Sequence, residues 1–218
     1  MPHKAILIGA TGLIGSNLLQ LIIENSFFSE VLVFTRSALS VSSPKLKQQI
    51  IDFDNLKQYT SLITADVIFC CIGSTRNKTP DKTHYKKVDV DYPLAFARIG
   101  VENNVKQFHI ITSLNANFQS SNSYLKLKGQ LEEELKKLNY TSLHIYQPSY
   151  LEGLRKEIRI DDKIMRPLMK LINPMLIGSL QKYRSIKASD VAQAMLNQSV
   201  KNLKGTFTYP SNRIKELA

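Results

Sequence analysis

The chain has 218 residues, of which 43% are hydrophobic and 22% charged, and 29 Lys and Arg against 18 Asp and Glu give it a formal net charge of +11. This composition is ordinary for a globular protein with one good-sized core or two small ones. No apolar run approaches the roughly 18 residues of a membrane span, and the two cysteines, Cys70 and Cys71, are adjacent, which excludes a disulfide framework.

The cysteines, the histidines and the net charge each lead to an expectation about location or ligands. The adjacent cysteines and the absence of a signal peptide predict a cytoplasmic location. The four histidines lack the spacing of metal ligands, so we expect no metal. The positive charge is compatible with a nucleic-acid or membrane partner, but no stacking aromatic residues or recognition helix accompany it. We therefore expect no membrane and no nucleic acid, and a site for an anionic cofactor instead.

Apolar strands and amphipathic helices alternate along the first two thirds of the chain. In chain order we predict a strand at residues 5–10, a helix at 13–24, strands at 30–37, 48–54 and 65–73, a helix at 88–103, a strand at 105–113, a helix at 124–138 and a strand at 142–149. Strands as apolar as these are buried on both faces, so the sheet should be parallel with helices on either side. The predicted fold class is α/β, with a doubly wound, Rossmann-type parallel sheet.

The alternation breaks down after Leu151. Residues 151–187 are basic and amphipathic and are interrupted by Pro167 and Pro174. From Arg155 to Lys187 nine Lys or Arg face three Asp or Glu, and a surface helix is predicted at residues 185–200. We expect one domain over residues 1–218, whose C-terminal third caps the ligand edge of the sheet, with 151–187 as a substrate lid. Met165, Leu168 and Met169 are expected to cover the pocket.

The segment G-A-T-G-L-I-G lies where the first predicted strand passes into the first predicted helix. Glycine permits a tight turn, a close approach of the backbone to a ligand, and packing of helix on strand. The unpaired amides at a helix start carry partial positive charge and suit a pyrophosphate. A glycine-rich turn without a ligand is the alternative. The predicted cofactor contacts of this turn are Gly9, Thr11, Gly12, Leu13, Ile14 and Gly15.

The next strands offer residues for the rest of a dinucleotide. An NAD site usually places Asp or Glu at the end of the second strand, whereas this chain has Arg36 and Ser37 there, which favours NADP over NAD unless Arg36 is only a solvated surface residue. Asp52 and Phe53 follow the third strand and are candidates for the adenine, although Asp52 is equally suited to capping a turn. After the fourth strand the candidates are Cys71, Gly73 and Ser74. We interpret both cysteines as residues of the core and of the pocket wall, and not as nucleophiles.

A candidate catalytic set follows the fifth strand. Ser113 ends that strand, and Tyr124 and Lys128 lie four residues apart on the next helix, which places both side chains on one face. An ammonium close to a phenol favours the phenolate. Such a pair can exchange a proton with a substrate oxygen while a hydride moves to or from nicotinamide. Otherwise Tyr124 packs in the core and Lys128 is solvated.

These residues resemble the short-chain dehydrogenase/reductase superfamily, in its atypical NAD(P)-binding branch. The resemblance extends over about residues 4 to 200. Within this branch, the chain is similar to the Tat-interactive protein oxidoreductase group. The segments that resemble this group are GATGLIG, TRS, ADVIFCCIGSTR, VDVDYPLAFARIGVENNVKQFHIITS, YLKLKGQLEEEL and ASDVAQAM.

The resemblance implies a Rossmann-type sheet, NADP at the glycine turn and a Ser-Tyr-Lys set at Ser113, Tyr124 and Lys128. It also implies that Arg36 contacts the 2′-phosphate and that Lys128 binds the nicotinamide ribose hydroxyls. The chain departs from the family pattern in two places. Gln147-Pro148 stands where many relatives have Arg-Pro, and the asparagine of the usual proton relay has no clear counterpart, although Asp89 and Asp91 lie in that region.

We therefore expect an NADP-dependent oxidoreductase that acts on a small carbonyl or alcohol substrate. The alternative is an NADP(H)-binding sensor or regulatory protein with little or no turnover, because some members of this branch bind the cofactor and act mainly as regulators. In that case the basic stretch from Arg155 to Lys187 would contact a protein partner.

Overall fold

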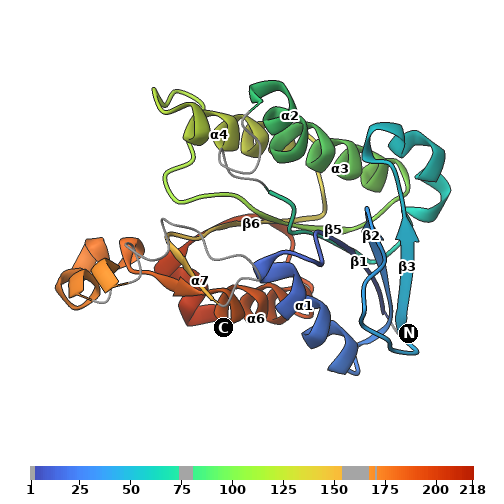
Figure 1. The fold of residues 1–218 in the computed structure, drawn as a ribbon, viewed down its shortest axis with the longest axis horizontal. Coiled ribbons are helices and arrows are strands. Elements are labelled where there is room, and N and C mark those ends of the chain that lie inside the picture. The colour runs from blue at the N-terminus through green and yellow to red at the C-terminus, as the bar shows by residue number, and fades with distance from the viewer. Residues whose placement is uncertain (1–2, 74–80, 154–166, 170) are drawn as a thin grey trace.

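A parallel sheet forms the centre of the protein in a computed structural model, which describes residues 3–73, 81–153, 167–169 and 171–218 (Figure 1). Every strand pairing in this sheet is parallel. Its 7 strands are, in spatial order, β3 (Leu46–Ile50), β2 (Phe28–Thr35), β1 (His3–Ile8), β4 (Val67–Cys70), β5 (Gln107–Ile111), β6 (Ser142–Gln147) and β9 (Gly205–Pro210). The strands are added outward from β1 to β3 on one side, and the chain then crosses back to add β4, β5, β6 and β9 on the other side of β1. This order confirms the predicted doubly wound sheet.

Helices cover both faces of the sheet. Figure 1 shows α3 (Tyr92–Glu102) and α4 (Ser123–Lys136) on one face, and α1 (Leu13–Glu24) and α6 (Ala188–Ser199) on the other. Each face therefore has its own buried apolar cluster, one centred on α1 and α6 and the other on α3 and α4. The central strands β1, β4, β5 and β6 are largely buried, which is why their sequences are apolar runs without alternation.

The helix that was predicted at 88–103 is longer and less regular. It begins with α2 (Lys82–Lys86), passes through a π-helical turn, η2 (Lys87–Asp91), and continues as α3. A π-turn has one extra residue in its hydrogen-bonded ring and is rare, and it is found frequently at functional sites. Apolar periodicity has no signal for such a turn, because the side chains on both sides of it still follow a helical pattern.

The C-terminal third contributes to the core of the domain and adds a strand that was not predicted. Residues 205–210 form the seventh strand, and α6 is buried on one side, where a surface helix was predicted. The strand has a sequence signal that was missed: Thr206, Phe207, Thr208 and Tyr209 alternate in burial, as an edge strand with one covered face requires. A last helix, α7 (Ser211–Leu217), follows it.

Only part of the expected lid, residues 151–187, is described, because residues 154–166 and 170, including Met165, lie outside the described residues. A short parallel pair joins β7 (Leu151–Glu152) to β8 (Ile186–Lys187) and so closes the segment at its base. Between them are the 3₁₀ turns η3 (Asn173–Met175) and η4 (Gly178–Tyr183). Met169 is buried and Leu168 is exposed. Among the described residues, no helix has the length and apolar character to cross a membrane.

Candidate functional site

The carboxyl ends of four central strands place most of the predicted site residues along one edge of the sheet. Ile8 of β1 pairs with Phe34 of β2 and with Cys70 of β4, and Cys70 pairs with Ile110 of β5. The residues that follow these four therefore emerge side by side, because parallel strands end at the same edge. In spatial order they are Arg36 after β2, the glycine turn after β1, Gly73 after β4 and Ser113 after β5.

The glycine turn is too crowded for side chains. Gly9 has a φ of +86°, and a Cβ at that position would lie 2.6 Å from the carbonyl carbon of Cys71. A Cβ at Gly15 would lie 2.1 Å from the carbonyl oxygen of Gly9. Gly12 N donates to Gly9 O, and Gly12 is the N-cap of α1, which has no side-chain cap. The turn thus brings bare backbone to the start of a 12-residue helix, where the first amides have no partner within the helix.

The flanking residues of the turn differ in exposure. Thr11 is exposed, Leu13 is half-buried and Ile14 is buried. The side chain of Leu13 packs so closely against Gly153 that a Cβ there would lie 2.6 Å from Leu13 Cδ1. The chain after β7 therefore returns to the start of α1, next to the glycine turn.

The two cysteines are free thiols in an apolar setting. Burial raises the pKa of Cys70 to about 12 and raises that of Cys71. A thiol with a raised pKa is a poor nucleophile at neutral pH. Cys71 contacts the glycine turn through its backbone, since its carbonyl group limits the space at Gly9. Ser74, the other predicted contact after β4, lies outside the described residues.

Arg36 lies at the edge of a small charged cluster. Arg36 and Ser37 are exposed beyond β2, and the positive charge of Arg36 acts on Tyr92. Tyr92 donates to Asp54 Oδ1 at 2.8 Å, and Lys87 Nζ lies 3.0 Å from the same oxygen. Burial, followed by the hydrogen bond to Asp54, raises the pKa of Tyr92 to about 12. Arg36 and Asp54 therefore both act on Tyr92, which the local sequence does not show, and the hydrogen bond from Lys87 lowers the pKa of Asp54.

The two candidates for the adenine have different surroundings. Asp52 is exposed, and its carboxylate accepts from Asp54 N at 3.0 Å and from Asn55 Nδ2 at 2.6 Å, so it caps η1 (Phe53–Leu62). Phe53 is half-buried, with its ring centroid 5.4 Å from that of Tyr92. The geometry gives Asp52 a capping role and places Phe53 in an aromatic wall.

Ser113 begins a loop that closes on α4. Its side chain is half-buried, and its hydroxyl donates over 3.4 Å to the carbonyl of Leu114. Further along, a Cβ at Gly129 of α4 would lie 2.2 Å from Phe118 N, so the loop backbone rests directly on that helix. Gly129 was not singled out from the sequence. It follows Lys128 in the chain and keeps the loop after Ser113 against the helix that carries Tyr124.

Tyr124 and Lys128 stand in the first two turns of α4. Asn122 caps this helix by accepting from Tyr124 N at 2.9 Å and from Leu125 N. Tyr124 is half-buried, whereas Lys128 is buried and its Nζ lies 2.7 Å from Asp89 Oδ1. Burial alone lowers the pKa of Lys128, but the charges of Asp89 and Tyr124 outweigh it and raise the pKa above its ordinary value. Lys128 is thus a buried ammonium, which excludes the alternative of a solvated lysine.

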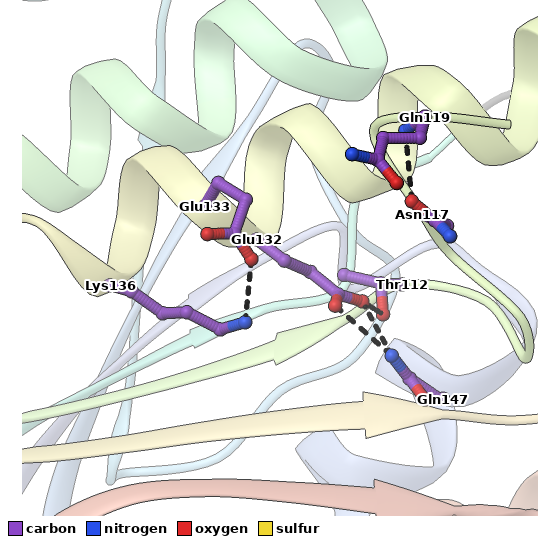
Figure 2. Close-up of polar contacts among 7 residues, drawn as sticks. All are labelled: Thr112, Asn117, Gln119, Glu132, Glu133, Lys136 and Gln147. Carbon is purple, nitrogen blue, oxygen red and sulfur yellow. Dashed lines mark hydrogen bonds and ion pairs between the residues drawn. The ribbon is translucent and has the colours of Figure 1, made fainter.

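A second buried polar group links α4 to the sheet. Glu132 is 4% exposed and accepts from Thr112 Oγ1 at 2.5 Å and from Gln147 Nε2 at 3.0 Å. Figure 2 shows these side chains converging from the ends of β5 and β6 onto the helix, while Lys136 turns to Glu133. Burial, only partly offset by the two hydrogen bonds, raises the pKa of Glu132. Gln147, which stands where the resemblance implies arginine, is therefore a neutral donor to this buried carboxylate.

Replacing Gln147 with leucine is expected to lower the free energy of unfolding by about 1–3 kcal/mol at neutral pH, because Glu132 loses donors while it remains buried. The change raises the pKa of Glu132 further, and stability gained from a raised carboxyl pKa is present in acid and is lost as the pH rises through that pKa. The deficit should therefore shrink in mild acid. Urea unfolding at neutral pH and in mild acid measures the loss in the free energy of unfolding. Gln130→Leu, on the exposed side of α4, is the control. Equal deficits for the two variants would contradict the prediction.

Asp89, Gly129 and Glu132 are the residues of this region to which the sequence assigned no role. Asp89 carried one weak signal, a carboxylate between two valines in a predicted helix. Gly129 and Glu132 carried none, because each owes its environment to a segment distant in the chain. Among the described residues, no group of three or more His, Cys, Asp or Glu side chains is placed to hold a metal ion.

Comparison with known proteins identifies relatives along nearly the whole chain. The family model described as HIM1 matches residues 19–188. The protein HTATIP2 of Rattus norvegicus is 29% identical over 218 residues, which cover 98% of this chain and 88% of the relative. The mitochondrial protein FMP52 of Candida albicans is 26% identical and covers 93% of this chain and 90% of its own.

Solved structures share the fold at low sequence identity. WbmH of Bordetella bronchiseptica, in complex with NAD+, superposes with a TM-score of 0.73 at 16% identity, covering 99% of this chain and 79% of its own. Vestitone reductase of alfalfa superposes with a TM-score of 0.65 at 17% identity, covering 95% and 76%. Such likenesses show the Rossmann-type sheet and leave cofactor preference and substrate open. A protein partner for the basic C-terminal stretch finds no support in these comparisons.

The expected cytoplasmic location is wrong by these comparisons. Relatives from Candida albicans, Aspergillus niger, Aspergillus fumigatus and Scheffersomyces stipitis are all named mitochondrial. The physical reason for the error is that free thiols indicate a reducing compartment without indicating which one.

Proposed function

Because this chain belongs to the HIM1 family and has the fold of the atypical short-chain dehydrogenase/reductases, we propose that it is an NADP-dependent oxidoreductase acting on a small carbonyl or alcohol substrate. The observation that carries the proposal is Tyr124 one helical turn before Lys128, whose charge is buried beside Gly73 at the carboxyl edge of the sheet. Burial of a charged group has a large free-energy cost, so a lysine that contributed only to solubility would remain exposed.

The residues at the edge of the sheet suit a dinucleotide. The glycine turn offers bare backbone amides at the start of α1 for a pyrophosphate, and it can pack this closely only because a Cβ at Gly9 or Gly15, which would collide with neighbouring backbone, is absent. Arg36, at the adenosine end, is an exposed cation for a 2′-phosphate. Lys128, at the other end, would hold the hydroxyls of the nicotinamide ribose. These positions follow the strand order, so the cofactor would lie across β2, β1 and β4.

The chain's own groups would handle the proton and the substrate oxygen. When bound, NADP supplies the acceptor or donor of a hydride. Tyr124 would give a proton to a carbonyl oxygen, or take one from an alcohol, with Lys128 one helical turn away on α4. Ser113 would donate a hydrogen bond to the same oxygen and so orient the substrate.

Replacing Arg36 with alanine tests the cofactor preference. We expect the affinity for NADPH to fall about tenfold to a hundredfold, since a charge-assisted hydrogen bond to the 2′-phosphate is lost, while the affinity for NADH stays the same. Calorimetric titration of both cofactors measures the two affinities. Arg98→Ala, which removes an exposed arginine of α3, is the control. An equal loss for both cofactors would show that Arg36 contributes no preference.

Turnover separates an enzyme from a cofactor-binding regulator. Incubation with NADPH and a broad panel of carbonyl compounds, followed by absorbance at the nicotinamide band, should reveal oxidation of the cofactor with at least one class. Tight NADPH binding without oxidation across the panel would instead favour a protein that binds the cofactor with little or no turnover.

A further inference from the structure

The helical run from Lys82 to Glu102 is irregular where it passes the site. Within its π-turn, Lys87–Asp91, two neighbouring carboxylates have opposite environments. Asp91 is exposed, and its carboxylate lies 3.8 Å from Lys86 Nζ. Asp89 is 1% exposed. The extra residue of a π-turn changes the direction of the side chains that it carries, and it is a recurrent feature of functional sites. Here it accompanies the placement of one carboxylate in the interior.

The buried carboxylate faces a buried ammonium. Asp89 Oδ1 lies 2.7 Å from Lys128 Nζ, and Lys128 is 3% exposed. Neither charge would be tolerated here alone, because an unpaired buried ion is strongly unfavourable. A pair that served stability alone could be replaced by apolar residues at little loss. The burial of both charges at the edge of the sheet thus calls for a reason beyond stability.

The pair stands directly behind Gly73. A Cβ at residue 73 would lie 3.5 Å from Asp89 Oδ1 and 3.8 Å from Lys128 Nζ, and Gly73 itself is exposed. The titratable groups that act on Lys128 come from three elements: Asp89 on η2, Tyr124 on α4 and Cys70 at the end of β4. Of these, Asp89 is the carboxylate, and it lies within contact distance of Lys128 Nζ.

We propose that Asp89 is a positioning residue of the site: its carboxylate, placed by the π-turn, holds the ammonium of Lys128 behind Gly73, charged and oriented toward the nicotinamide ribose. This inference rests on the proposed function, which gives Lys128 its ribose contact. An ammonium has three protons, so the contact with Asp89 leaves two for ribose hydroxyls and Tyr124. Asp89 acts through Lys128 and takes no part in proton transfer.

The test compares Asp89→Asn with Asp91→Asn in the full chain. Asparagine keeps the shape but cannot neutralise Lys128, whose pKa then falls through burial, so the ammonium is lost as the pH rises. Titration with NADPH, followed by its fluorescence, is made from about pH 7 to about pH 9. We expect Asp89→Asn to bind NADPH about tenfold or more weakly than Asp91→Asn at the alkaline end, with a smaller deficit at neutral pH. In a Lys128→Met background, Asp89→Asn should bring no further loss.

The outcomes separate the inference from the proposed function. If the wild-type chain binds neither NADPH nor NADH, the proposed function fails and the inference with it. If the wild-type chain binds NADPH and Asp89→Asn binds it like Asp91→Asn, the inference alone is overturned. It is also overturned by a deficit that is independent of pH or that persists without Lys128, because such a deficit reports a general disturbance of the fold.

Circular dichroism and thermal unfolding establish that each variant is folded. If Asp89→Asn does not fold, Asp89→Glu keeps the charge and moves it by one methylene. We expect this variant to bind NADPH more weakly than Asp91→Glu. Equal affinities of the two glutamate variants would overturn the proposal.

Discussion

Replacing Tyr124 with phenylalanine is expected to lower turnover about a hundredfold to ten-thousandfold while the affinity for NADPH stays the same. The phenol of Tyr124 is the proposed proton donor or acceptor, and α4 places it one turn before Lys128 with its backbone amide held by Asn122. The variant removes one oxygen and keeps the ring, so the helix and its cap should be unchanged. The measurement is the oxidation of NADPH with a carbonyl substrate found in the panel, together with a binding titration.

Tyr59→Phe is the matched control, because Tyr59 is a partly buried tyrosine of η1 that packs against the core on the α3 side. Its turnover should equal that of the wild-type chain. Unchanged turnover in Tyr124→Phe would exclude the phenol as the acid or base. A loss of NADPH affinity that accounts for the whole fall in turnover would instead show that Tyr124 acts in cofactor binding.

Replacing Gly9 with alanine should damage both the fold and the site. The new Cβ would lie 2.6 Å from the carbonyl carbon of Cys71, on backbone that cannot yield cheaply, and its φ of +86° is strained for any residue with a side chain. Together these effects should lower the free energy of unfolding by about 3 kcal/mol or more. Any folded fraction should bind NADPH poorly, because the turn must move away from the position that brings its amides to the helix start. Urea unfolding and NADPH titration measure the two effects.

Gly178→Ala separates strain from crowding. Gly178 also has a positive φ, +56°, but a Cβ there would meet nothing within 4 Å. Its alanine variant should therefore show only the backbone penalty, about 1–2 kcal/mol, and should bind NADPH normally. If Gly9→Ala is no more destabilised than Gly178→Ala, the contact between the glycine turn and Cys71 is looser than the geometry indicates.

The elements of the fold that carry strong local patterns were predictable. Five strands follow from short apolar runs, and the glycine spacing at Gly9, Gly12 and Gly15 marks the turn after the first of them. The third strand, predicted at 48–54, instead spans Leu46–Ile50, because this edge strand is largely polar and has no apolar run to set its bounds. Residues 205–210 were missed because an edge strand is half exposed, and its alternation of threonine and aromatic residues is a weaker signal than a continuous apolar run. Six predicted strands with three predicted helices between them were enough to specify a parallel sheet.

The sequence by itself determined the sheet, the glycine turn and the helical spacing of Tyr124 and Lys128, because each depends on residues within a few positions of one another. Only the tertiary structure decided that Lys128 is buried against Asp89, that Gln147 satisfies Glu132, and that Arg36 and Asp54 both act on Tyr92. These pairings join residues from different elements, and their energies depend on burial and on separation in space. Neither quantity exists until the strands have taken their order, so no local pattern can encode them.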